Sequence, residues 1–66
     1  MELGKPKQII ELKSGAVSSR LLELGFLPGR NIELVRVSPL GDSVYVKVEE
    51  MTYALRKEEL EYIVTS

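Results

Sequence analysis

The residue types that most often carry catalysis are missing, because the chain contains no His and no Cys. Their absence removes the commonest general base, the thiolate nucleophile, and the imidazole and thiolate ligands of metals. Carboxylates remain, as Glu49 with Glu50 and as Glu58, Glu59 and Glu61. A general acid among them needs an apolar pocket that raises its pKa, whereas adjacent residues point in different directions. The sequence predicts no enzyme, no catalytic residue and no bound cofactor.

Metal and phosphate sites are also not indicated. A hard cation such as Mg²⁺ could touch the carboxylates weakly, but no acidic loop has calcium-binding spacing, so we predict no specific metal site. Gly25 and Gly29 follow a helical pattern, whereas the glycines of phosphate-binding loops precede a helix, and the spacing of those motifs is absent. We interpret both as turn glycines.

Binding to another protein is the chemistry that the sequence does favour. Two turns place an apolar residue where solvent-facing turns are normally polar, and exposed apolar loop tips are typical of docking faces. The alternative is that Leu27 and Leu40 fold under the ends of the domain as plugs. Arg56 follows Leu55 and could supply a rim charge or pair with a carboxylate. The predicted partner-binding residues are Leu27, Pro28, Gly29, Pro39, Leu40, Gly41, Asp42, Tyr53, Leu55 and Arg56.

The aromatic and basic residues admit two further readings. Tyr45, Tyr53 and Tyr62 could line a groove for an extended peptide, or at least two of them could cap the core with their hydroxyls in water. The nine basic residues are scattered among ten acidic ones, for a net charge of −1. That distribution is no footprint for a phosphate backbone or an anionic bilayer, so we predict no nucleic-acid partner.

The elements that position these residues follow from periodicity and turn signals. Val44, Val46 and Val48 alternate with polar residues, as in a half-buried strand. In the strand before it, the apolar positions change face between Leu34 and Val35, which predicts a bulge. The expected elements are a strand at residues 8–13, a helix at 17–24, strands at 31–37, 43–49 and 51–56, a helical turn at 57–61 and a strand at 62–65.

Turn chemistry separates the first helix from the strand that follows it. Gly25 suits the left-handed position that ends a helix, and Phe26 could close the contact back onto Leu21 that accompanies a Schellman motif. Pro28 and Gly29 have the order that a type II turn requires. So small a sheet buries its apolar face best by coiling on itself, which predicts a mainly β fold, a small SH3-like barrel of about five strands.

Length and composition place the chain among small globular domains. Its 66 residues are 44% hydrophobic and 29% charged, which is ordinary for a folded protein and leaves room for one domain, residues 1–66. The lack of Cys favours a reducing cytoplasm. No apolar run approaches the roughly 20 residues of a membrane span, so we predict no direct insertion into a membrane. The oligomeric state stays open.

Three ordered segments together resemble the ferrous iron transport protein A (FeoA) family. Their order and spacing agree with that family over about residues 7 to 64, and three blocks are more specific than a single Pro-Gly turn. The segments are Arg20-Leu21-Leu22-Glu23-Leu24-Gly25-Phe26-Leu27-Pro28-Gly29, then Pro39-Leu40-Gly41-Asp42, then Ala54-Leu55-Arg56-Lys57-Glu58-Glu59.

The resemblance implies an SH3-like barrel in a small cytoplasmic protein. It further implies an accessory or regulatory role in bacterial or archaeal ferrous iron uptake, through contact with FeoB, a transmembrane transporter with a cytoplasmic GTP-binding domain. The sequence departs from the family before the first strand, where members usually carry a Leu-rich turn ending in Pro-Gly, and this admits a stand-alone variant.

Two other functions stay open as alternatives to docking on the transporter. One is a regulatory domain that responds to Fe²⁺ or another transition metal through Glu58, Glu59 and Glu61. The other is a generic SH3-like peptide-binding module, in which a proline-rich ligand would contact Tyr45 or Tyr53.

Overall fold

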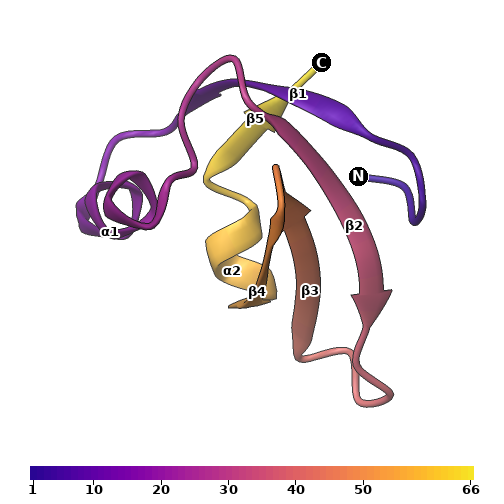
Figure 1. Cartoon of the computed structure of the whole chain (residues 1–66). Coiled ribbons are helices and arrows are strands. Elements are labelled where there is room, and N and C mark those ends of the chain that lie inside the picture. Colours follow the sequence, from indigo (N-terminus) through magenta and orange to yellow (C-terminus); the bar gives the residue numbers. More distant parts are fainter.

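Five strands and two short helices make up the protein (Figure 1). The structure is a computed structural model that describes every residue from Met1 to Ser66. Each expected element is present, and no boundary differs from the prediction by more than one residue. In chain order the elements are β1 (Lys7–Leu12), α1 (Ala16–Leu24), β2 (Asn31–Val37), β3 (Ser43–Val48), β4 (Met51–Arg56), α2 (Lys57–Leu60) and β5 (Ile63–Thr65).

The strands form one antiparallel sheet in the order β4-β3-β2-β1-β5. Strand β1 pairs with two neighbours along its length. Lys7 and Gln8 pair with β2, whereas Ile9 to Leu12 pair with β5. This division of one strand between two partners bends the sheet sharply. The sheet wraps around its core as the SH3-like prediction required (Figure 1).

The sheet does not close fully into a barrel. No backbone pairing joins β4 to β5, so these two strands remain the edges of the sheet. The physical reason is that the chain between them forms α2, which packs beside β3 and β4, and the returning strand is only three residues long. The barrel therefore lacks one strand pairing, that of β4 with β5.

Two bulges produce the sharp coiling. Leu34 pairs with Val46 and Arg36 with Tyr45, so Val35 has no partner, which confirms the bulge predicted at this step. A second irregularity lies in β1, where Ile9 and Glu11 face consecutive residues of β5. The bulges increase the local twist of β1 and β2. Each of these strands can therefore bend between its two neighbours in the sheet.

The core consists of ten buried apolar residues. The alternation in β3 is confirmed, since Val44, Val46 and Val48 are buried while Lys47 between them is exposed. The other core residues are Ile9, Leu21, Phe26, Ile32, Leu34, Leu55 and Ile63. Of the three leucines in α1, only Leu21 is fully enclosed, because Leu22 and Leu24 are each 43% exposed.

Helix α1 ends in the predicted Schellman motif. Gly25 lies in the left-handed region at φ 107°, and its N–H donates to the Leu22 carbonyl at 3.0 Å. The Phe26 N–H donates to the Leu21 carbonyl at 3.0 Å, which places the Phe26 ring in the core. Each of these bonds satisfies a carbonyl at the helix end that would otherwise lack a partner.

The Pro-Gly turn that follows α1 is part of the framework. The Arg30 N–H donates to the Leu27 carbonyl at 3.1 Å and Gly29 has φ 94°, as the type II turn requires. The Gly29 N–H donates to the Ile9 carbonyl at 2.7 Å, and the Ile9 N–H donates to the Arg30 carbonyl at 2.8 Å. This turn fastens the entrance of β2 to β1.

Candidate functional site

The loop between β2 and β3 carries the most exposed large apolar side chain of the protein. Leu40 is 89% exposed, so the alternative in which it plugs the barrel end is wrong. The Ser38 hydroxyl donates to Asp42 Oδ1 at 2.8 Å, and the Gly41 N–H donates to the Ser38 carbonyl at 2.9 Å. These bonds fix the loop in one shape, and it holds Leu40 out in solvent.

Charged residues from the end of β4 lie beside this loop. Ser43 is the cross-strand partner of Arg56, and a surface hollow of about 270 Å³ is lined by Asp42, Ser43, Arg56 and Glu58. The Ser38 hydrogen bond is the main reason that the pKa of Asp42 lies below its ordinary value, and the positive charge of Arg56 contributes. Asp42 is therefore ionised in the folded protein at neutral pH.

We call Leu40, Asp42 and Arg56 the Leu40 face. It joins one apolar side chain to two opposite charges on a loop and a strand end that backbone pairing holds together. Such an arrangement can anchor a partner through the leucine and orient it through the charges.

The other predicted loop lies at the far end of β2. Leu27, Pro28 and Gly29 precede the first residue of β2, whereas Pro39 to Asp42 follow its last one (Figure 1). A strand of this length spans roughly 20 Å at about 3.3 Å per residue. The two predicted docking loops therefore lie at opposite ends of β2 and do not form one continuous face. Leu27 is 37% exposed, and its turn is explained by the bonds to β1.

Two other residues of the predicted docking set belong to the core region. Leu55 is only 4% exposed, so its assignment to the surface was wrong. It points inward because Leu55 shares a strand face with Tyr53, whose ring lies 4.9 Å from the Phe26 ring. The Tyr53 hydroxyl donates to the Leu24 carbonyl at 2.8 Å and so ties β4 to the end of α1.

The three tyrosines do not line a common groove. Tyr53 and Tyr62 are half-buried and pack against the core, as the capping alternative predicted, although the Tyr53 hydroxyl bonds to the Leu24 carbonyl and not to water alone. Tyr45 projects from the other side of β3, where the Arg36 guanidinium lies 5.6 Å from the centre of its ring. The peptide-binding alternative therefore lacks the aromatic trough on which it depended.

Among the C-terminal carboxylates, Glu59 has a structural task. Its Oε1 accepts a hydrogen bond from the Arg56 N–H at 2.8 Å, which caps the first turn of α2. Its Oε2 forms an ion pair with Arg20 of α1, and the Glu59 side chain is only 16% exposed. Because both oxygens are engaged, Glu59 is not a free metal ligand, and no three acidic side chains come together in a metal-holding arrangement.

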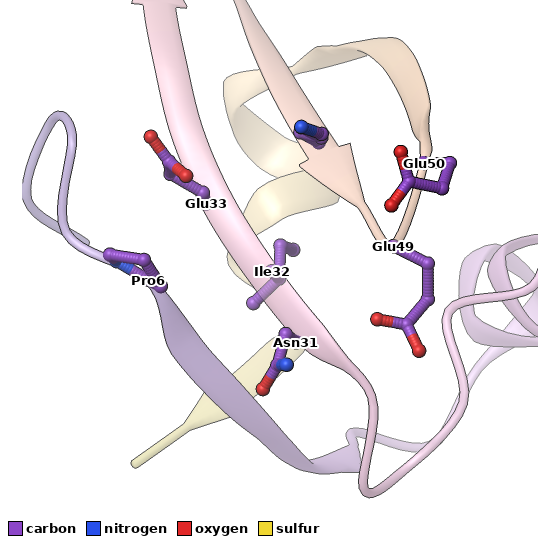
Figure 2. A pocket seen from close by; sticks show the side chains of 7 residues that line it. Pro6, Asn31, Ile32, Glu33, Glu49 and Glu50 are labelled. Carbon is purple, nitrogen blue, oxygen red and sulfur yellow. The ribbon is translucent and has the colours of Figure 1, made fainter.

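A second surface hollow, of about 250 Å³, was not anticipated from the sequence (Figure 2). It gathers Glu33 from β2, Lys47 from β3, and Glu49 and Glu50 from the β3–β4 turn, with Pro6 at its rim. Only the register brings these groups together, since Glu33 and Lys47 are cross-strand partners. Five of the seven residues that line it are polar or charged, unlike the mainly apolar lining typical of a small-molecule pocket.

Fold and surface together define a class of protein. It is a small SH3-like β domain that presents the Leu40 face on its surface. Neither helix has the length and apolar composition needed to cross a bilayer. Comparison with known proteins makes the assignment specific. The model of the FeoA domain family matches residues 1–65, so the chain belongs to the FeoA domain family.

Relatives of known structure share the whole fold. Iron(II) transport protein A from Clostridium thermocellum is 37% identical with a TM-score of 0.90, over 100% of this chain and 41% of that one. FeoA from Stenotrophomonas maltophilia, solved with zinc, is 27% identical with a TM-score of 0.87, over 100% of this chain and 84% of that one. That protein is described as a prokaryotic SH3 domain protein and a candidate activating factor of ferrous iron transport.

A curated relative joins two components in one polypeptide. It is the Fe(2+) transport protein A/Fe(2+) transporter FeoB fusion protein of Porphyromonas gingivalis, 38% identical over 45 residues. The match covers 68% of this chain and 5% of that protein. This chain thus corresponds to a small part of the fusion protein, and membership of a family associated with ferrous iron transport is what the comparisons establish.

The family match also bears on the first residues of the chain. It begins at residue 1, earlier than the resemblance read from the sequence. In the structure this segment is attached to the sheet, because the Gly4 N–H donates to the Leu34 carbonyl at 2.8 Å and Leu3 forms a parallel bridge with Leu34. The short N-terminal segment is thus a part of the domain.

Proposed function

We propose that this protein is a cytoplasmic accessory component of bacterial or archaeal ferrous iron uptake that docks on the cytoplasmic part of a FeoB-type transporter. The fusion protein of P. gingivalis supports the choice of partner, since it carries the two components in one chain. Fusion keeps two partners at high effective concentration, which is an advantage when their contact is functional. The docking changes the conformation or assembly of the transporter, and no chemical step on this chain is required.

The observation that carries the proposal is the 89% exposure of Leu40 on a loop fixed by hydrogen bonds. Holding an apolar side chain in water is unfavourable, and a docking partner that covers it recovers that free energy. Burying a leucine contributes about 1.5–3 kcal/mol. A loop that is already ordered loses little conformational entropy on binding, so this part of the cost of association is small.

Asp42 and Arg56 give the contact its orientation. Their opposite charges line the surface hollow beside the loop that carries Leu40, and both residues are exposed. Charges at the rim of an interface mainly determine the rate of association and the choice of partner. The matching surface of the transporter is therefore expected to present an apolar recess with both a basic and an acidic group beside it.

The test is a calorimetric titration of the purified domain into the cytoplasmic region of the transporter from the same organism. Wild type is compared with Leu40→Glu, and Leu3→Glu is the control because Leu3 is also exposed, at 61%, on a different segment. Loss of the buried leucine and burial of a carboxylate should weaken binding at least about 30-fold, which corresponds to about 2 kcal/mol. Equal affinity of wild type and Leu40→Glu would remove the loop from the interface.

A further inference from the structure

Strand β4 leaves one edge of the sheet open. Its only neighbour is β3, and Val48 pairs with Met51 across a two-residue turn. In such a hairpin the closing pair is hydrogen bonded and the pattern then alternates, so Thr52, Ala54 and Arg56 direct their N–H and C=O groups away from β3. The Arg56 N–H indeed turns outward and donates to Glu59.

Nothing in the fold covers the middle of this edge. Thr52 and Ala54 are exposed and have no hydrogen bond from their outward backbone groups. Helix α2 covers only the end of the strand, since its cap binds Arg56. An uncovered edge of this kind is a template for pairing with another strand.

The charges along this edge are arranged antisymmetrically. Glu49 and Glu50 precede β4, Arg56 ends it and Lys57 follows, and the midpoint between these two charged ends is Tyr53. A strand that carries opposite charges at its two ends is complementary to a second copy of itself running in the opposite direction. A parallel copy would instead place acidic residues beside acidic residues.

We propose that β4 pairs with β4 of a second copy of this chain to form a symmetric antiparallel dimer with a continuous sheet. The unpaired N–H and C=O groups of Thr52 in one copy meet those of Ala54 in the other, which gives roughly four hydrogen bonds across the twofold axis. In this register Glu50 of each copy stands directly opposite Arg56 of the other. Shifting one strand by two residues separates Glu50 from Arg56 of the other copy. The charges therefore favour this register over the others.

The proposed dimer shares Arg56 with the Leu40 face but does not use its apolar anchor, so Leu40→Glu tests docking alone, whereas E50R and Thr52→Pro test the dimer alone. It uses the edge of β4, whereas the anchor of the Leu40 face lies on the β2–β3 loop. A small contact of this kind is expected to be weak, with a dissociation constant of roughly 10⁻⁴ M at about 50 mM salt. Leu40→Glu should leave it unchanged, so failure of one proposal can be told from failure of the other.

Charge reversal provides the test, by sedimentation equilibrium of the intact domain up to about 1 mM. E50R and R56E should each weaken self-association at least about tenfold, because each places like charges opposite each other at both ends of the contact. An equimolar mixture of E50R and R56E should associate again, since the arginine at position 50 of one faces the glutamate at position 56 of the other. The double variant E50R/R56E should recover dimers by itself.

A backbone variant checks that the edge itself is used. Thr52→Pro removes an outward N–H without disturbing a bond to β3, and should abolish the dimer while circular dichroism shows a folded domain. A wild type that remains monomeric at about 1 mM overturns the proposal. So does self-association that persists unchanged in Thr52→Pro, or an E50R and R56E mixture that stays monomeric.

Discussion

Glu59 lies in a helix of only four residues, but its two contacts should make a large contribution to the stability of the fold. Replacing it by Ala removes the hydrogen bond from the Arg56 N–H and the ion pair with Arg20. Loss of a cap costs about 0.5–2 kcal/mol, and a partly exposed ion pair contributes about 0.2–1 kcal/mol. We expect Glu59→Ala to lower the free energy of unfolding by about 1–2 kcal/mol.

The two contributions can be separated by a conservative variant. Glu59→Gln keeps an oxygen that accepts from the Arg56 N–H but loses the charge that faces Arg20, so it should cost less than about 1 kcal/mol. In a domain of this size 1 kcal/mol moves the melting temperature by about 4–8 °C, so Glu59→Ala should melt about 5–15 °C below wild type. Glu58→Ala is the matched control, because Glu58 lies in the same turn and is exposed.

The assay is thermal and urea unfolding followed by circular dichroism, with all variants at the same pH and salt. A Glu59→Ala protein as stable as Glu58→Ala, within about 0.5 kcal/mol, would refute the reasoning that this carboxylate joins the two helices. An Arg20→Ala variant closes the double-mutant cycle. Arg20→Ala should have little further effect on stability in a Glu59→Gln background, because the charge that Arg20 pairs with is already absent.

Further predictions concern the turns, the loop and metal binding. Glu49 has φ 55°, which is unfavourable for a residue with a Cβ, so Glu49→Gly should raise the free energy of unfolding by about 0.5–1 kcal/mol in urea titrations. Gly25→Ala forces a Cβ into φ 107° and should destabilise by about 1–2 kcal/mol in the same assay. The lowered pKa of Asp42 means that its stabilisation is present above the ordinary pKa and is lost as the pH falls through the folded value. Ser38→Ala removes the main cause, so NMR titration of the carboxyl should show a higher pKa. Anaerobic calorimetry with Fe²⁺ should show no binding tighter than about 10⁻⁵ M, and tighter binding would favour the metal-responsive alternative.

The local signals in the sequence were sufficient for the elements of the fold. Strand β3 alternates strictly because one of its faces is buried, and Gly25 and Gly29 stand where positive φ is required. The change of apolar face after Leu34 identified the bulge at Val35 because a strand has a period of two. These features depend on neighbouring residues, which is why they could be read without the structure.

The features that depend on distant pairing were not predicted. Division of β1 between two partners, and an open edge at β4, follow from which strands meet. The contact between Arg20 and Glu59 likewise joins residues far apart in the chain. No period or motif in the sequence encodes such contacts.

The predicted docking residues also differ in whether local sequence or distant pairing determines their position. The exposure of Leu40 could be anticipated because no folding signal explained a leucine in that loop, whereas only the pairing of Arg56 with Ser43 shows that Arg56 lies near the same loop. Leu27 was grouped with it only because both lie on turns, although β2 separates the two loops. The burial of Leu55 could have been read from its alternation with Tyr53, since residues two apart share a face of a strand.

The proposed function depends on direct contact between the Leu40 face and the cytoplasmic part of the transporter. The most direct measurement is an NMR titration of the isotope-labelled domain with the unlabelled cytoplasmic region of FeoB, followed through the backbone amides. We expect the largest shifts on residues 40–42 and on Arg56, with little change at the Leu27 turn. Shifts centred on the hollow between Glu33 and Glu49, with the Leu40 loop unaffected, would contradict it.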